Sequence, residues 1–207
     1  MTTIGDISFW YADIGLPQTR RAPLPGDTTA DVCIIGAGYT GLWSAYYLKK
    51  ADPTLRIVIC EKNFAGFGAS GRNGGWLTGG FAWNHDRYLA TSTESAVRAM
   101  VQAMNGTVDE IIRVADAEGI SADILRTDEL MVATTPAQLA RCEAETAHRR
   151  HWGEHRVHMI GAGQTASRVN IPGVLGAMVV EGVAPHPARQ TRPRPRAGGR
   201  GDGRHDP

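Results

Sequence analysis

The chain has 207 residues, a hydrophobic fraction of 42% and a formal net charge of +1. This length fits one domain or two small ones, and the hydrophobic fraction excludes a wholly disordered chain. The longest uncharged stretch near the start, Cys33–Leu48, has 16 residues and three glycines, whereas a spanning helix needs about 20 apolar residues. We therefore expect no membrane association, and the near-neutral charge gives no reason to expect a nucleic-acid partner.

The three cysteines are far apart and form no C-x-x-C pair. This spacing predicts neither a disulfide framework nor a zinc site, and no other metal site is expected. Cys33 and Cys60 lie in apolar runs, which predicts that both are buried as small hydrophobic residues. A reducing cytoplasm is the expected compartment.

The first readable unit follows a polar, proline-containing arm over residues 1–30. The β-branched runs 31–35 and 56–61 predict two strands that are buried on both faces. Between them, residues 40–51 have helical spacing and end in lysines, which favours a helix C-terminus. The order strand, glycine turn, helix, strand predicts a βαβ crossover.

The rest of the chain is less regular. Residues 63–80 form a long glycine-rich loop, and residues 86–118 have helical spacing with an expected break near Asn105–Gly106. Residues 122–134 suggest two short strands, and Thr135 is placed to cap a helix that runs to about residue 150. Residues 176–180 predict a strand, and the G-x-G pattern at 161–163 suggests a loop.

The motif Gly36-x-Gly38-x-x-Gly41 follows the first strand and opens the helix, and Glu61 ends the second strand. In this context the glycines permit a tight turn, a close approach of a pyrophosphate and close packing of helix on strand. The helix N-terminus can hold the diphosphate, and Glu61 can accept hydrogen bonds from ribose hydroxyls. The pattern predicts an adenine-dinucleotide site and disfavours the 2′-phosphate of NADP.

A second glycine cluster follows Glu61, where a nicotinamide dehydrogenase would normally continue into another crossover helix. A loop of small residues can lay backbone amides against a large flat ring, which favours a flavin. We expect the two glycine clusters to form one site. An NAD-dependent dehydrogenase and a non-catalytic dinucleotide-binding fragment remain alternatives.

The runs PLPGDTTADVCIIGAGYTGLWSAYYL and CEKNFAGFGASGRNGG resemble the start of flavoproteins of the D-amino-acid oxidase type, most closely the bacterial gamma-glutamylputrescine oxidase branch. The resemblance is strongest over residues 23–75 and weaker over 165–189. It implies an α/β fold: a Rossmann-like FAD-binding βαβ core with part of an α+β substrate domain, incomplete. It also implies FAD as the cofactor, an amine or amino acid as substrate and molecular oxygen as acceptor, with oxidation of a C–N bond.

By the same resemblance, the cofactor is held by residues of both glycine clusters. The glycine turn and Glu61 would hold the diphosphate and ribose, and the second loop would lie along the diphosphate and isoalloxazine. The residues so implied are Gly36, Gly38, Tyr39, Thr40, Gly41, Glu61, Lys62, Ala69, Ser70, Gly71, Arg72, Asn73 and Gly74. No catalytic side chain is assigned.

The chain departs from the family after residue 189, where an arginine-, proline- and glycine-rich run replaces the expected helix. Composition and resemblance together suggest four segments: an N-terminal arm (1–30), an FAD-binding Rossmann core (31–85), a helical and partial substrate domain (86–189) and a disordered basic tail (190–207). We interpret the tail as out of frame, from a truncated or frameshifted gene, with an authentic basic tail as the alternative, and expect the chain to be inactive as it stands.

The chain has seven histidines, a residue type that can bind metals or take part in acid–base chemistry. His148 and His151 are spaced i, i+3, but a glycine and several arginines nearby argue for exposed histidines rather than a metal site. His85 follows the glycine-rich loop 63–80 and could approach a substrate, although an ordinary loop histidine is the simpler interpretation.

Overall fold

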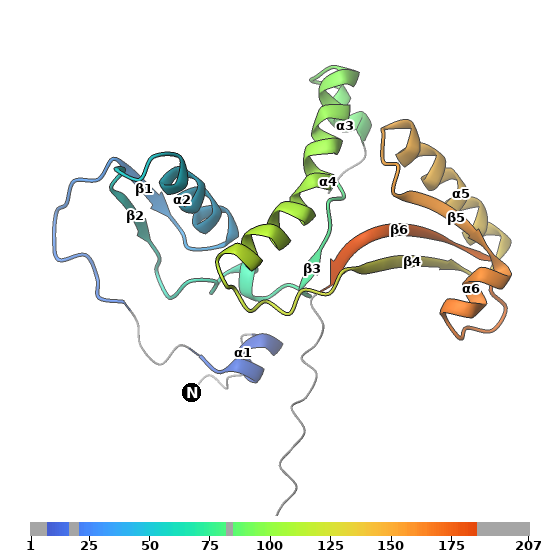
Figure 1. Cartoon of the computed structure of the whole chain (residues 1–207), viewed down its shortest axis with the longest axis horizontal. Helices are drawn as coiled ribbons and strands as arrows, with labels where there is room; N and C mark the ends of the chain where they lie inside the picture. Colours follow the sequence, from blue (N-terminus) through green and yellow to red (C-terminus); the bar gives the residue numbers. More distant parts are fainter. Residues whose placement is uncertain (1–7, 17–20, 82–84, 186–207) are drawn as a thin grey trace, which may run out of the picture. The chain divides into compact units, whose positions relative to one another are not determined.

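The computed structural model describes residues 8–16, 21–81 and 85–185, and the expected tail 190–207 lies outside this part of the chain. The chain divides into two compact units whose boundary falls between Gly74 and Gly75. Figure 1 shows the elements of each. None of the helices in the described ranges combines the length and apolar character needed to cross a membrane. The domain boundaries expected from the sequence stay a prediction.

The first unit contains the expected βαβ crossover. Strand β1 (Val32–Ile35) pairs in parallel with β2 (Ile57–Cys60), and α2 (Tyr39–Ala51) connects them. The ammonium of Lys49 donates hydrogen bonds to the carbonyls of Pro53 and Leu55, which ties the end of α2 to the turn before β2. The Rossmann-like core expected from the sequence is therefore present.

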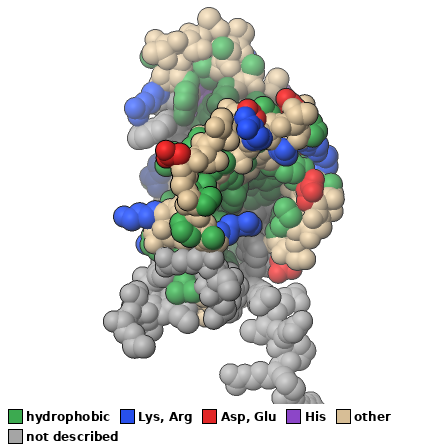
Figure 2. All heavy atoms as spheres, turned by 90° about the vertical axis from the view of Figure 1, so that its left-hand side faces the viewer, with side chains coloured by type: hydrophobic (Ala, Val, Ile, Leu, Met, Phe, Trp, Pro, Cys, Tyr) green, Lys and Arg blue, Asp and Glu red, His purple; other side chains and the backbone are tan. Residues whose placement is uncertain are grey.

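The prediction that β1 and β2 are buried on both faces is wrong for this chain. Along β1 the side chains alternate between half-buried and exposed, and Ile35 is 82% exposed. Cys33 is also exposed and Cys60 is half-buried, so neither is the buried thiol that was expected. Burial on both faces needs a layer on each, and Cys33 and Ile35 are left uncovered. Figure 2 shows hydrophobic side chains at the surface among the charged ones.

The arm expected over residues 1–30 is not irregular throughout. Residues Phe9–Ile14 form a helix, α1, whose first turn is capped by the Ser8 hydroxyl, which accepts a hydrogen bond from the Tyr11 N–H at 3.3 Å. Sequence patterning missed this helix because six residues are too few to show a period.

The second unit is a sheet organised around one long strand (Figure 1). Strand β6 (Gly176–Pro185) pairs antiparallel with β3 (Trp76–Leu77), β4 (Thr127–Ala133) and β5 (Val157–Gly161). Within the described part of this unit, four helices accompany the sheet: α3 (His85–Leu89), α4 (Glu94–Ala117), α5 (Pro136–His151) and α6 (Ala162–Arg168). Thr135 caps α5 as predicted, and the structure adds a capping box with Gln138.

Three local predictions fail in this unit. Helix α4 continues through Asn105–Gly106, and the break comes before its N-cap Thr93. Residues 122–134 contain one strand, because only 127–133 pair with β6. The Gly161-Ala-Gly163 segment is not a loop, since Gly161 ends β5 and Ala162 begins α6.

The core of the second unit lies on both sides of β6. Met178 and Val180 belong to a cluster with Cys142 of α5, whereas Ala177 and Val179 belong to a second cluster with Ile160. All four β6 residues are at most 7% exposed. The continuous apolar run of β6 is thus typical of a strand covered on both faces, in contrast to β1.

His85 is buried and not a loop histidine. Its ring stacks on Trp152 with a centroid distance of 5.2 Å and an interplanar angle of 5°. His85 Nδ1 lies 3.2 Å from His148 Nε2, and His85 Nε2 lies 3.5 Å from a carboxylate oxygen of Glu154. Glu154 in turn accepts hydrogen bonds from Arg149 at 2.9 and 2.6 Å. Among the described residues, no group of three or more His, Cys, Asp or Glu side chains could hold a metal ion.

This environment predicts a loss of stability in weak acid. Burial lowers the pKa of His85, Glu154 and Glu145 oppose that shift, and His148 and Arg149 add to it. The folded state therefore binds fewer protons than the unfolded state, and the free energy of unfolding should fall as the pH drops through about 6.5, the ordinary histidine value.

Urea unfolding at pH 7.5 and 5.5, followed by circular dichroism, measures this slope. We expect His85→Gln to flatten it and His155→Gln, at an exposed position, to leave it unchanged. An unchanged slope in His85→Gln would contradict the assignment.

Candidate cofactor site

The glycine turn after β1 is built by close backbone contacts. Gly36 has a φ of +98°, a conformation that favours glycine, and its N–H donates to the carbonyl of Cys60 at 2.8 Å. A β-carbon on Gly41 would collide with the carbonyl oxygen of Gly36 and would lie 3.2 Å from Ile34 Cγ2. The first turn of α2 can therefore rest directly on β1 only because residue 41 lacks a side chain.

Glu61 holds this turn from the end of β2. Its carboxylate accepts hydrogen bonds from the N–H groups of Ala37 and Asn63, both at 3.0 Å. These two backbone hydrogen bonds hold the pKa of the Glu61 carboxyl below its usual value, so the group is ionised at neutral pH. A carboxylate offers about four lone-pair sites, which leaves acceptor capacity for a ligand. The sequence suggested the ribose role but not this structural one.

The second glycine cluster lies against the first. The N–H of Tyr39, at the start of α2, donates to the Ser70 hydroxyl at 2.8 Å, and a β-carbon on Gly38 would lie 2.9 Å from the same oxygen. The Gly66 N–H donates to the carbonyl of Ala37 at 2.9 Å. The Tyr39–Ser70 hydrogen bond thus brings together two segments that are 31 residues apart in the sequence.

The remaining residues of the second loop hold its own backbone. Arg72 Nε donates to the carbonyl of Phe67 at 3.0 Å, and its guanidinium lies 4.8 Å from the centroid of the Phe67 ring. The Asn73 amide donates to the carbonyl of Ser70 at 2.8 Å. Ala69 and Gly71 bound a single 3-10 turn, and Gly74 has open space where a β-carbon would be.

The last two residues of the predicted site, Thr40 and Lys62, lie in the first turn of α2 and shortly after β2. Thr40 and Lys62 are both exposed. The first N–H groups of a helix have no partner within it and carry partial positive charge. Together with the glycine turn they form a cradle that can hold a diphosphate. Two residues that the sequence did not suggest, Trp10 and Tyr11 of α1, also contact the second glycine-rich loop.

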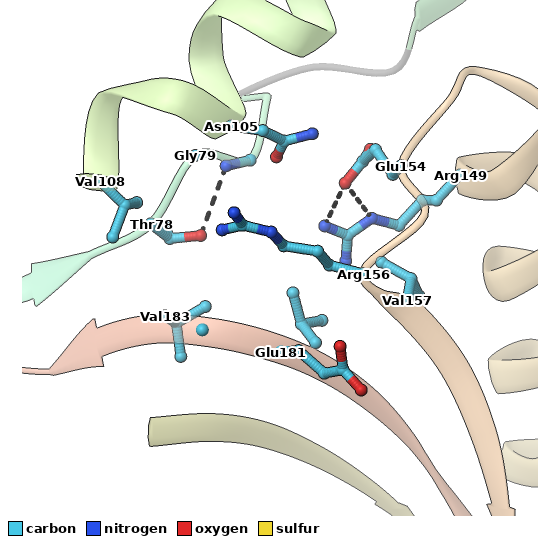
Figure 3. Close-up of a pocket in the computed structure, with 13 residues that line it drawn as sticks. Thr78, Gly79, Asn105, Val108, Arg149, Glu154, Arg156, Val157, Glu181 and Val183 are labelled. Carbon is cyan, nitrogen blue, oxygen red and sulfur yellow. Dashed lines mark hydrogen bonds and ion pairs between the residues drawn. The ribbon is translucent and has the colours of Figure 1, made fainter. Parts of the chain in front are cut away.

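A pocket in the second unit is too small for a substrate. It is lined by residues including Thr78, Asn105, Arg149 and Arg156, and the space open to the centre of a water molecule is about 20 Å³ (Figure 3). That is room for about one water molecule. Both arginines have partners, since Arg149 pairs with Glu154 and Arg156 with Asp109. No catalytic residue is assigned from this pocket.

The contact at Gly41 predicts the effect of a single methyl group. Gly41→Ala would push α2 away from the glycine turn, and overpacking of this kind costs about 1–3 kcal/mol. Urea unfolding should show that loss. Gly68→Ala is the matched control, because a β-carbon at Gly68 meets nothing within 4 Å. Equal stability of the two variants would contradict the role given to Gly41.

Comparison with known proteins shows the family to which the chain belongs. The sequence model of the family described as FAD dependent oxidoreductase (DAO) matches residues 31–192. The chain is 33% identical over 173 residues to gamma-glutamylputrescine oxidoreductase of Escherichia coli, which covers 83% of this chain and 40% of that protein. The chain therefore spans about two fifths of the length of this relative.

Solved structures agree on the fold. L-amino acid deaminase from Proteus vulgaris matches with a TM-score of 0.60 and 19% identity over 83% of this chain and 37% of its own. L-alpha-glycerophosphate oxidase from Mycoplasma pneumoniae, solved with FAD bound, matches with a TM-score of 0.58 and 18% identity over 77% of this chain and 39% of its own. With a family match over most of its length and a glycine turn of this geometry, the chain belongs to the DAO family of FAD dependent oxidoreductases.

Proposed function

We propose that the first unit binds FAD between its two glycine-rich segments. The observation that carries the proposal is the 2.8 Å hydrogen bond from the Tyr39 N–H to the Ser70 hydroxyl, which joins the two segments at the start of α2. Gly36, Gly38, Tyr39, Thr40 and Gly41 would receive the diphosphate.

The other residues of the proposed site would either contact the ribose or belong to the second glycine-rich loop. Glu61 and Lys62 would lie at the ribose, with the Glu61 carboxylate as acceptor for its hydroxyls. The second loop would follow the diphosphate and flavin ring with Ala69, Ser70, Gly71, Arg72, Asn73 and Gly74.

The reaction class we assign by family descent is oxidation of a C–N bond in an amine or amino acid. When bound, FAD supplies an acceptor for the two electrons and the hydrogen lost from the carbon next to nitrogen. The substrate becomes an imine, which water hydrolyses, and molecular oxygen is the terminal acceptor, reduced to hydrogen peroxide. Family membership and the resemblance to gamma-glutamylputrescine oxidoreductase support this class.

We propose further that this chain binds the cofactor without turnover. Among the described residues, Cys33 and Ile35 leave apolar surface of β1 uncovered, which supports a unit that is not closed over a substrate. The three cysteines are free thiols, which supports the cytoplasm as the compartment.

Titration of the purified chain with FAD, followed by quenching of flavin fluorescence, tests the proposal. Removing the charge at the ribose acceptor should weaken binding, because hydrogen bonds to charged groups contribute about 1.5–3 kcal/mol. We expect Glu61→Gln to raise the dissociation constant at least about tenfold. Glu143→Gln, an exposed glutamate on α5, is the matched control and should bind like the wild-type chain.

The outcomes separate the alternatives. Absence of FAD binding by the wild-type chain contradicts the proposal, and binding of NADH in its place would support a nicotinamide-dependent dehydrogenase. Peroxide formation that depends on an added amine would overturn the claim of inactivity while supporting the reaction class.

A further inference from the structure

Helix α1 has an unusual source of stability. It contains only six residues, Phe9–Ile14, and isolated helices shorter than about 12 residues are marginal in water. Local caps help at both ends: Ser8 at the start and Gly15, with a φ of +82°, at the end. Two adjacent aromatic side chains, Trp10 and Tyr11, add contacts with the glycine-rich segment Gly66–Gly74, here called the flavin loop.

The first contact is a hydrogen bond. The indole N–H of Trp10 donates to the carbonyl oxygen of Asn73 at 2.6 Å. The Asn73 side chain donates to the carbonyl of Ser70 at 2.8 Å, and the Ser70 hydroxyl accepts from the Tyr39 N–H at 2.8 Å. A continuous series of bonds therefore runs from α1 through the flavin loop to the N-terminus of α2.

The second contact is steric. Tyr11 is 7% exposed, and its ring meets Phe64 edge to face with centroids 5.2 Å apart. Its hydroxyl lies 2.5 Å from the position of a β-carbon on Gly71 and 3.2 Å from that on Gly66. The tyrosine occupies space that is available because both residues are glycine. Burial raises the pKa of Tyr11, in keeping with this enclosed position.

We propose that Trp10 and Tyr11 are positioning residues of the cofactor site, which hold the flavin loop in its binding conformation before the cofactor arrives. This inference rests on the proposed binding of FAD by the same loop. Its physical basis is preorganisation: a loop that is already ordered loses less conformational entropy when a ligand binds. Neither side chain needs to touch the cofactor for this role.

Trp10→Phe separates the hydrogen bond from the aromatic packing. The variant keeps a ring at position 10 but has no N–H for the Asn73 carbonyl. Loss of one neutral hydrogen bond should open the loop about fivefold more often and raise the FAD dissociation constant by up to the same factor. Trp76→Phe is the matched control, since Trp76 is 61% exposed and lies on β3 in the second unit.

Limited trypsin digestion without FAD provides a readout that does not depend on the cofactor. Arg72 lies in the flavin loop and is exposed, so cleavage after it reports opening of the loop. We expect cleavage after Arg72 to be about fivefold faster in Trp10→Phe, with cleavage after Arg113 of α4 unchanged. Equal acceleration at both sites would show general loosening and would overturn the proposal.

The two readouts distinguish the two claims. If the wild-type chain binds no FAD but Trp10→Phe is cleaved faster after Arg72, the proposed function fails while the ordering of the loop by Trp10 stands. If Trp10→Phe equals the wild-type chain in both FAD affinity and cleavage, the positioning role is wrong and the proposed function is unaffected.

Discussion

The first unit depends on how closely α2 approaches the turn after β1. The missing side chain at Gly41 allows the helix to rest against Gly36 and Ile34, and the ionised Glu61 fixes the turn from the other strand through Ala37. Once this geometry is set, the N-terminus of α2 faces the second glycine cluster, and Ser70 can bond to Tyr39. A shift of α2 would disturb both the diphosphate cradle and the loop that follows it.

The two units bury their apolar side chains to different extents. In the second unit, Ala177 and Val179 are fully buried on one side of β6, and Met178 is buried on the other. In the first unit, α2 contains no buried residue and β1 exposes Cys33 and Ile35. The first unit therefore keeps its backbone geometry through hydrogen bonds and glycine contacts more than through a closed apolar core. Exposed apolar strand surface of this kind favours association with other surfaces.

Sequence patterning was informative where the signal is local and failed where burial depends on distant segments. The glycine turn, α2, the cap at Thr135 and the family all follow from short motifs. The prediction that Cys33 and Cys60 are buried was wrong, because an apolar run shows hydrophobicity but not whether another layer covers it. The burial of His85 was missed because its neighbours, His148 and Trp152, lie more than 60 residues further along the chain. Trp10 and Tyr11 were missed for the same reason, since Asn73 and Gly71 are equally distant in sequence.

The central position of β6 has a consequence for how the second unit forms. Strands β3, β4 and β5 each pair with β6, which comes after all of them in the chain. During synthesis the ribosome must release residues 176–185 before any of these pairings can close. Until then β4 and α5 can only make local contacts, and contacts between distant segments close slowly because of the loop entropy they cost. Assembly of this sheet is thus expected to be a late, cooperative event, in which β6 pairs with three segments that have already been synthesised.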